Sequence, residues 1–177
     1  MKKTYLILTV FTLFMLSCQE KGAENFYQKG LVKASKQNFE NALNNFNTAI
    51  SIDSTNPVYY FDRAFYAKEN LGDFAGAIED YTIAIDLEND DNDANAYSNR
   101  GHAQMMLKNY QDAITDIQKA ISLDPNNSYS FRNRALLFIE IKNMNMACVD
   151  LQQALDLGFT DSYGGEVEEL IEKYCKE

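Results

Sequence analysis

Residues 94–127 read ANAYSNRGHAQMMLKNYQDAITDIQKAISLDPNN. This stretch predicts two helices folded against each other, with Asp124-Pro125 ending the second because proline cannot continue a helix. Aromatic and small residues alternate along both helices, and the same order of residue types recurs elsewhere in the chain. This recurrence indicates an internal repeat.

The same pattern begins again at Ala23, Pro57 and Ser128, so that successive copies are spaced by 34, 37 and 34 residues. A small residue stands at the eighth position of every copy: Gly30, Ala64, Gly101 and Ala135. Two alanine columns run through the second helices: Ala42, Ala77, Ala113 and Ala147, then Ala49, Ala84, Ala120 and Ala154. Small residues in these columns let two antiparallel helices approach closely, which indicates a packing code.

This period and this order of aromatic, small, aromatic, alanine and proline residues resemble the tetratricopeptide repeat (TPR). The resemblance implies an all-α, TPR-type right-handed α-solenoid of about four helix-turn-helix repeats plus a C-terminal capping helix. The repeat domain is expected at 24–161, with copies at 24–56, 57–93, 94–127 and 128–161. The chain lacks the tryptophan of the family, and Lys33 stands where the first copy would have an aromatic residue.

Eight helices are predicted in the repeats, at about 24–37, 39–53, 57–71, 74–87, 94–107, 110–123, 128–142 and 144–157. A solenoid exposes the apolar face of its final repeat unless something covers it. Val167, Leu170, Ile171 and Tyr174 recur at three- and four-residue intervals, so residues 162–177 are expected to hold a capping helix at about 166–176.

Composition and charge exclude one class of partner. The 177 residues include only 2 prolines but 11 phenylalanines and 11 tyrosines, which favours a helical chain with a substantial core. The formal net charge is −10, and it becomes −12 if Lys2 and Lys3 leave with a leader. Such a surface repels phosphate backbones, so no nucleic-acid partner is expected.

Residues 1–17 have the layout of an export signal, with Lys2 and Lys3 ahead of an uncharged apolar run. The run is too short to span a bilayer, which takes roughly 20 residues. Ser17-Cys18 follows at once and resembles the lipobox of bacterial lipoproteins, which implies cleavage and lipid modification of Cys18, for example by palmitate. An ordinary signal peptide with a chance cysteine is the alternative.

Residues 18–23 are then expected to tether the body to a membrane, because several acyl chains anchor a protein firmly. The predicted location is the bacterial cell envelope. Gln19, rather than aspartate, follows the cysteine, which by resemblance suggests the outer membrane. Periplasmic and surface-exposed orientations both remain open.

Two further columns pair basic with acidic side chains. The seventh position holds arginine and the twenty-third holds aspartate in three copies, giving the pairs Arg63–Asp80, Arg100–Asp116 and Arg134–Asp150. The first copy has Lys29 and Asn45 instead, so the two columns change together. We expect each arginine to bond the aspartate of its own hairpin as a bidentate pair. A row of arginines that binds anions is the alternative.

Cys148 and Cys175 remain once Cys18 carries lipid, an even number in an oxidising compartment. Cys148 stands in a column that, in the family, packs toward the next hairpin, and here the capping helix takes that place. The resemblance therefore implies a Cys148–Cys175 disulfide, with two buried free thiols as the alternative.

Catalysis and metal binding have little support in the residues. His102 is the single histidine, no glycine-rich phosphate loop is present, and no metal or cofactor is expected. The acidic run at 88–93 could supply oxygen ligands to calcium, but it lacks the glycine and distal glutamate of a calcium loop. A solvated linker is favoured there.

The family lines its concave face with residues from the first helix of each repeat. Carried over, these positions are Tyr27, Leu31, Phe61, Phe65, Lys68, His102, Met105, Met106, Tyr129, Arg132, Leu136 and Ile139. Aromatic and methionine side chains suit an adaptable surface for a peptide or helix, unless they simply pack on one another. The lysine and asparagine clamp that some relatives use for a C-terminal carboxylate is not reproduced, because Tyr27 and Leu31 occupy its first two places.

The sequence thus predicts a non-catalytic protein–protein interaction module, an adaptor or scaffold anchored to the envelope. Its partner is expected to be a protein or peptide held in the concave groove. The alternative is a structural component that associates with itself through the convex face or the edge of the cap. The identity of the partner and the oligomeric state are left open.

Overall fold

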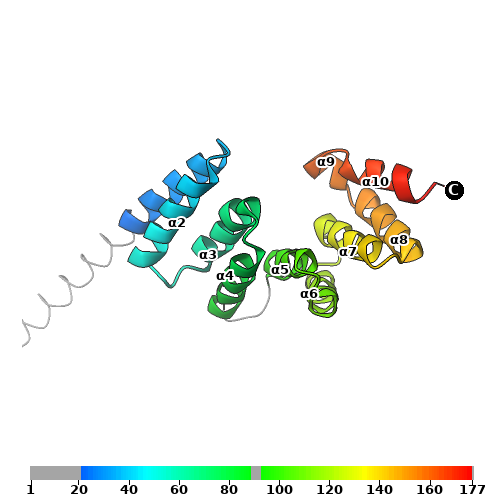
Figure 1. Cartoon of the computed structure of the whole chain (residues 1–177), viewed down its shortest axis with the longest axis horizontal. Helices are drawn as coiled ribbons and strands as arrows, with labels where there is room; N and C mark the ends of the chain where they lie inside the picture. The colour runs from blue at the N-terminus through cyan, green and yellow to red at the C-terminus, as the bar shows by residue number, and fades with distance from the viewer. Residues whose placement is uncertain (1–20, 89–92, 177) are drawn as a thin grey trace, which may run out of the picture. The chain divides into compact units, whose positions relative to one another are not determined.

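The structure is a computed structural model that describes residues 21–88 and 93–176 (Figure 1). The chain divides into two compact units, one ending at Asp73 and the other beginning at Phe74. Every regular element of the described residues is helical. The export signal, Cys18 and most of the acidic run at 88–93 lie outside the described residues, so the lipid, calcium and linker assignments stay predictions.

The first unit holds one complete helical hairpin and the first helix of the next repeat. Its elements are a helix at 21–34, α2 (Phe39–Ile52), α3 (Pro57–Arg63), the π-helix η1 (Ala64–Lys68) and the 3-10 helix η2 (Glu69–Leu71). Asn56 caps α3 by accepting a hydrogen bond from the Val58 amide, and Pro57 occupies the first helical position.

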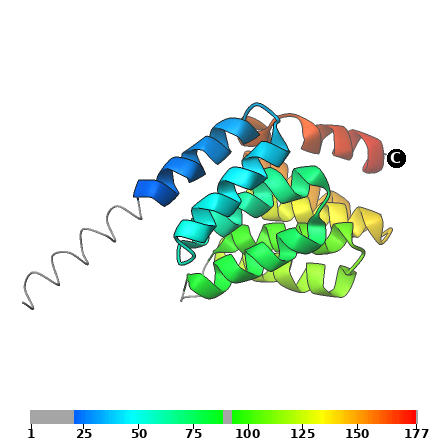
Figure 2. The same ribbon diagram turned by 60° about the vertical axis from the view of Figure 1, so that its left-hand side comes forward.

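The second unit continues the hairpins and ends in two shorter helices. Its helices are α4 (Phe74–Leu87), α5 (Ala94–Met106), α6 (Tyr110–Leu123), α7 (Ser128–Glu140), α8 (Met144–Asp156), α9 (Phe159–Tyr163) and α10 (Glu166–Tyr174). Helices α5 and α6 lie side by side as one hairpin, and α7 and α8 form the next (Figure 2). The all-α TPR-type class is confirmed.

The small-residue columns mark the places where paired helices touch. A Cβ added at Gly101 would lie 2.6 Å from Ile117 Cγ1 and 3.0 Å from the carbonyl oxygen of Ala113. At Gly30 an added Cβ would lie 2.7 Å from the Phe46 ring. The alanine columns are buried as well, so the packing interpretation of the repeat is confirmed.

Two helix predictions need correction. The first helix includes residues 21–23, which the sequence analysis assigns to the tether, and Ala23 is fully buried. The predicted helix at 57–71 changes from α to π to 3-10 geometry. Asn70 Nδ2 donates to the carbonyl oxygens of Phe65 (3.1 Å) and Tyr66 (3.4 Å), and this side-chain competition accompanies the wider turn.

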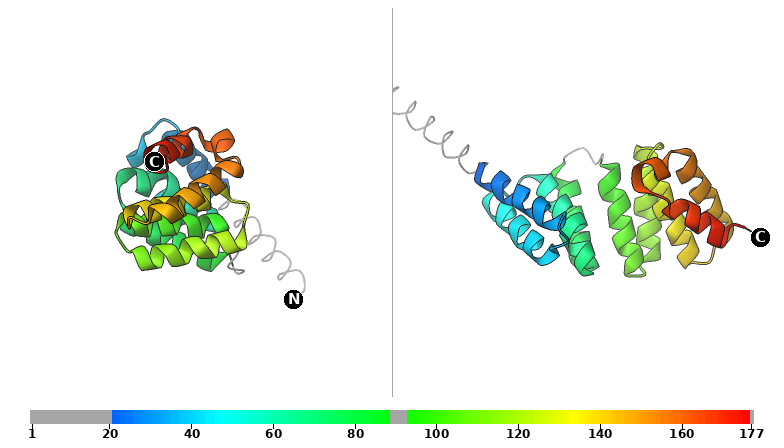
Figure 3. Two further views of the ribbon diagram at one scale, coloured as in Figure 1. Left: turned by 90° about the vertical axis from the view of Figure 1, so that its right-hand side faces the viewer. Right: turned by 90° about the horizontal axis from the view of Figure 1, so that it is seen from above.

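The C-terminal segment covers the last repeat, as the cap prediction requires, although α9 was not predicted. Phe159 of α9 and Val167 of α10 are buried against Ala135, Leu151 and Ala154. Helix α10 lies along α8 (Figure 3). Gly158, with φ of +79°, ends α8 in the left-handed conformation and turns the chain toward α9.

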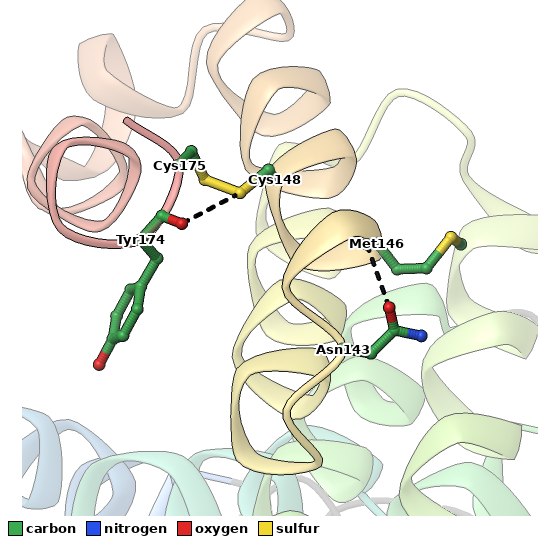
Figure 4. The surroundings of a disulfide bond; sticks show 5 residues. All are labelled: Asn143, Met146, Cys148, Tyr174 and Cys175. Atoms are coloured by element: carbon green, nitrogen blue, oxygen red, sulfur yellow. Dashed lines mark hydrogen bonds between the residues drawn. A yellow bond between two sulfur atoms is a disulfide. The ribbon is translucent and has the colours of Figure 1, made fainter. Parts of the chain in front are cut away.

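A disulfide holds the end of the cap. Cys148 of α8 and Cys175 are joined, with their Cα atoms 5.6 Å apart (Figure 4). The Cys148 sulfur also lies 3.7 Å from the carbonyl oxygen of Tyr174, and this is a contact because a disulfide sulfur has no proton to donate. The pairing implied by the family resemblance is present.

None of the helices at 21–88 and 93–176 combines the length and apolar character that crossing a bilayer requires.

Candidate interaction surface

The first unit brings five predicted groove residues onto its first helices. Tyr27 and Leu31 belong to the helix at 21–34, Phe61 to α3, and Phe65 and Lys68 to η1, and all five side chains are partly exposed. Tyr27 and Leu31 also pack against the core around Phe46, so the alternative of mutual packing holds in part for them.

Three aromatic rings are in contact with one another along α3 and η1. The rings of Phe61 and Phe65 stack at 6.2 Å, and Phe65 meets Tyr66 edge to face at 4.9 Å. Tyr66 is 39% exposed. We call Phe61, Phe65 and Tyr66 the aromatic row. A partly exposed row of this kind suits contact with another apolar or cationic group.

A carboxylate lies within this surface. Asp62 is only 9% exposed, and Tyr27 Oη donates a 2.6 Å hydrogen bond to its Oδ2 atom. Burial raises the pKa of Asp62, while the Tyr27 hydrogen bond acts in the opposite direction, and no basic side chain is among the influences. Burial also raises the pKa values of Tyr27 and Tyr66, and the Asp62 charge adds to both shifts.

The predicted groove residues of the second unit are not all exposed. His102 and Ile139 are partly exposed, and Met106 is 47% exposed. Met105 is 6% exposed and packs in the core with Ala113, Ile117 and Leu137, so its assignment to the groove is wrong. Leu136 packs against the same core.

Tyr129 and Arg132 already contact the C-terminal segment of the chain. The Tyr129 ring stacks on Phe159 at 6.5 Å and meets Tyr163 at 5.5 Å. The Arg132 guanidinium bonds the Glu166 carboxylate at the start of α10. Both residues remain partly exposed, so their assignment to the groove stays a prediction.

The arginine–aspartate columns form bidentate pairs in the second unit. Arg100 donates from Nε and Nη2 to the two oxygens of Asp116 at 2.7 and 2.9 Å, and Arg134 bonds Asp150 in the same way at 2.7 and 2.8 Å. The hydrogen bond to Asp116 raises the pKa of Arg100. Both arginines are engaged, so the anion-binding alternative is wrong for them.

Arginines at the seventh position of the repeat also donate hydrogen bonds to side chains of the preceding repeat. Arg100 Nη1 donates to Thr82 at 3.1 Å, and in the first unit Arg63 Nη1 donates to Asn47 at 2.7 Å. These contacts support a structural role for the column. The Arg63–Asp80 pair would join the two units, and it stays a prediction.

Sequence reasoning missed Asp62 and Tyr66, although a signal was present. The sixth position of the four copies holds Gln28, Asp62, Asn99 and Asn133. Three copies thus carry an amide, and one carries a carboxylate. This column lies next to the positions that the family uses for the groove and is not one of them.

In the described part of the chain, no group of three histidine, cysteine, aspartate or glutamate side chains is placed to hold a metal ion.

Comparison with known proteins identifies the repeat. Family models of the tetratricopeptide repeat match residues 23–56 and 94–127. A DnaJ homolog subfamily C member 7 homolog of Dictyostelium discoideum is 36% identical over 113 residues, covering 62% of this chain and 19% of that protein. Other curated relatives are matched over 16% and 28% of their own length, so the chain corresponds to a small part of such proteins.

Solved structures agree on the fold. The TPR domain of Arabidopsis OM64 is 27% identical, with a TM-score of 0.64, and the match covers 69% of this chain and 98% of that one. The first TPR of Spaghetti (RPAP3), bound to the HSP90 peptide SRMEEVD, is 24% identical, with a TM-score of 0.64 over 70% of this chain and 95% of that one.

Proposed function

We propose that this tetratricopeptide-repeat protein is a non-catalytic adaptor or scaffold that binds a peptide or helix of a protein partner through the first helices of its repeats. The observation that carries the proposal is the aromatic row. Phe61, Phe65 and Tyr66 are partly exposed and in ring contact on one helix. Exposed aromatic surface of this kind is typical of peptide recognition, because rigid rings supply contact area at a small entropic cost.

A carboxylate-binding role like that of chaperone-tail adaptors is disfavoured. The HSP90 peptide bound by the RPAP3 domain contains three acidic residues and ends in a carboxylate. Tyr27 and Leu31 stand where a carboxylate clamp needs lysine and asparagine, and the neighbouring Asp62 adds negative charge. An acidic peptide would meet repulsion here.

Anchoring to the bacterial envelope is the second part of the proposal. It rests on the sequence of residues 1–18, where basic residues and a short apolar run precede Ser17-Cys18. Lipidation of Cys18 would hold the repeats at a membrane surface, with the outer membrane favoured by Gln19. Labelled palmitate should enter the protein in cells, and a Cys18→Ala variant that still incorporates the label would refute the assignment.

Self-association is the alternative, and one observation favours it. Met146 and Val149 lie one turn apart on α8 and are both exposed, Val149 to 63%. Apolar side chains at this spacing form a small contact surface on the outside of the last repeat. Light scattering over a hundredfold concentration range decides the matter: a constant monomeric mass argues against this alternative, and a rising mass supports it.

The groove proposal is tested by replacing the aromatic row. Peptides that bind the wild-type chain should lose binding to a Phe61→Ser/Phe65→Ser variant, because the stacked rings are removed. Val149→Ser is the matched control, since it also removes an exposed apolar side chain. Circular dichroism confirms that each variant is folded. Unchanged binding by the folded double variant would refute the proposal.

A further inference from the structure

Asp62 is a charged residue in a position where the repeat needs only a hydrogen-bonding one. In the second unit the sixth position of the last copy is Asn133, whose Nδ2 donates to the backbone oxygen and the hydroxyl of Ser98 in the preceding copy. In the first unit Asp62 makes the equivalent contact, accepting from Tyr27 of the preceding copy. The bond between neighbouring repeats is therefore a scaffold feature that both copies share.

The negative charge of Asp62 is not needed for that bond. An asparagine oxygen would accept the Tyr27 hydroxyl equally well, and Asn99 and Asn133 stand in the same column. A carboxylate at 9% exposure instead loses much of its hydration. Buried carboxylates are ordinarily paired with a cation, yet the hydrogen bond that Asp62 accepts from Tyr27 comes from an uncharged hydroxyl. Burying the Asp62 carboxylate therefore costs hydration free energy, and the hydrogen bond between repeats does not explain why a charged residue is present.

The surroundings of Asp62 suit a cation. Tyr27 lies on one side through its hydrogen bond. Tyr66 follows one helical turn along, is 39% exposed, and is near enough for the Asp62 charge to add to the rise of its pKa that burial causes. Phe65 meets Tyr66 edge to face, so this second tyrosine is part of the aromatic row. Aromatic faces attract cations, and arginine both stacks on rings and bonds carboxylates.

We propose that Asp62, with the rings of Tyr27, Phe65 and Tyr66, forms a binding site for a lysine or arginine side chain of the partner peptide. The inference rests on the proposed function, since it names the charge of the partner that the aromatic row binds. The formal charge of −10 on the chain supports it, because an acidic protein attracts a basic partner over long range.

The test begins with a selection from a random heptapeptide library displayed on phage, using the full-length chain as bait. We expect arginine or lysine to be enriched at one position, next to apolar residues that contact the aromatic row. A selected peptide is then synthesised twice, once with arginine at that position and once with citrulline. Citrulline keeps the shape of arginine and removes its charge.

The affinities of the two peptides for the wild-type chain and for Asp62→Asn, four in all, isolate the contribution of Asp62. Citrulline should weaken binding to the wild-type chain about tenfold or more, because a charge-assisted bond is lost. Asp62→Asn, which keeps an acceptor for Tyr27, should bind both peptides with nearly equal, weak affinity. Glu24→Gln is the matched control: it removes the same charge from a carboxylate that also accepts a tyrosine hydroxyl, that of Tyr59 at 3.3 Å. It should preserve the preference for arginine.

The outcomes are distinct. Selected peptides without a basic residue, or an arginine preference that persists in Asp62→Asn, would overturn the inference. If such peptides still lose binding to the Phe61→Ser/Phe65→Ser variant, the proposed function survives while the cation site does not. Failure to select any peptide would count against both. The citrulline comparison on the wild-type chain decides the charge preference even if Asp62→Asn does not fold.

Discussion

Breaking the Cys148–Cys175 disulfide should loosen the cap by an amount that the loop length predicts. The two cysteines are 27 residues apart, for which the chain-entropy relation gives about 3.5 kcal/mol of stabilisation at 25 °C. Helix α10 has only nine residues and would be marginal alone, so the remaining contacts of Val167 and the Arg132–Glu166 ion pair must hold it once the bond is lost.

Amide hydrogen exchange measures this loss locally, which matters because repeat proteins open in parts. A decrease of 3.5 kcal/mol corresponds to a fall of two to three orders of magnitude in the protection of the α10 amides. A Cys148→Ser/Cys175→Ser variant should show it without reductant, and the wild-type chain should match the variant once reduced. Amides of α5 and α6 serve as the internal control. Equal protection of α10 in the oxidised and reduced wild-type chain would refute the reasoning.

Three further changes test the packing and the charges. Gly101→Ala should lower the free energy of unfolding in urea by about 1–3 kcal/mol, because its Cβ would lie 2.6 Å from Ile117, whereas Gly165→Ala, which meets nothing within 4 Å, should change little. Arg134→Ala should cost about 3–5 kcal/mol, since it leaves a carboxylate of 1% exposure without its cation; equal stability of variant and wild type would contradict the structural role. The raised pKa of Asp62 means that the folded state binds its proton more tightly, so this group's contribution to stability is lost as pH rises through the raised pKa. Asp62→Asn should therefore melt no lower than the wild type at pH 7, with the difference shrinking toward pH 4; a lower melting temperature at pH 7 would show that the charge stabilises the fold.

The fold was predictable because the repeat is encoded in columns of small and large residues. Gly101 and Ala113 stand where their helices touch, and each column is visible by aligning the chain with itself. The pairing of Arg100 with Asp116 was predictable for a similar reason, since both columns change together in the first copy. The periodic sequence predicts these contacts because equivalent residues make the same contacts in neighbouring repeats.

The surface was less predictable because it depends on what covers each position. Met105 has a family groove position, yet Leu137 and Ile117 bury it. Tyr129 is partly covered because its ring stacks on Phe159 of α9, and the repeat columns do not predict α9. The π-helix at Ala64–Lys68 is accompanied by local hydrogen bonds of Asn70, which a periodic pattern does not predict.

Site-specific photo-cross-linking in intact cells shows whether the aromatic row contacts a partner protein. The full-length chain is produced with p-benzoylphenylalanine in place of Phe65, on the aromatic row, or in place of Val149, which is 63% exposed on α8. We predict an adduct with a different protein from position 65 and none from position 149. No adduct from position 65, together with a dimer of this chain cross-linked through position 149, would contradict the account.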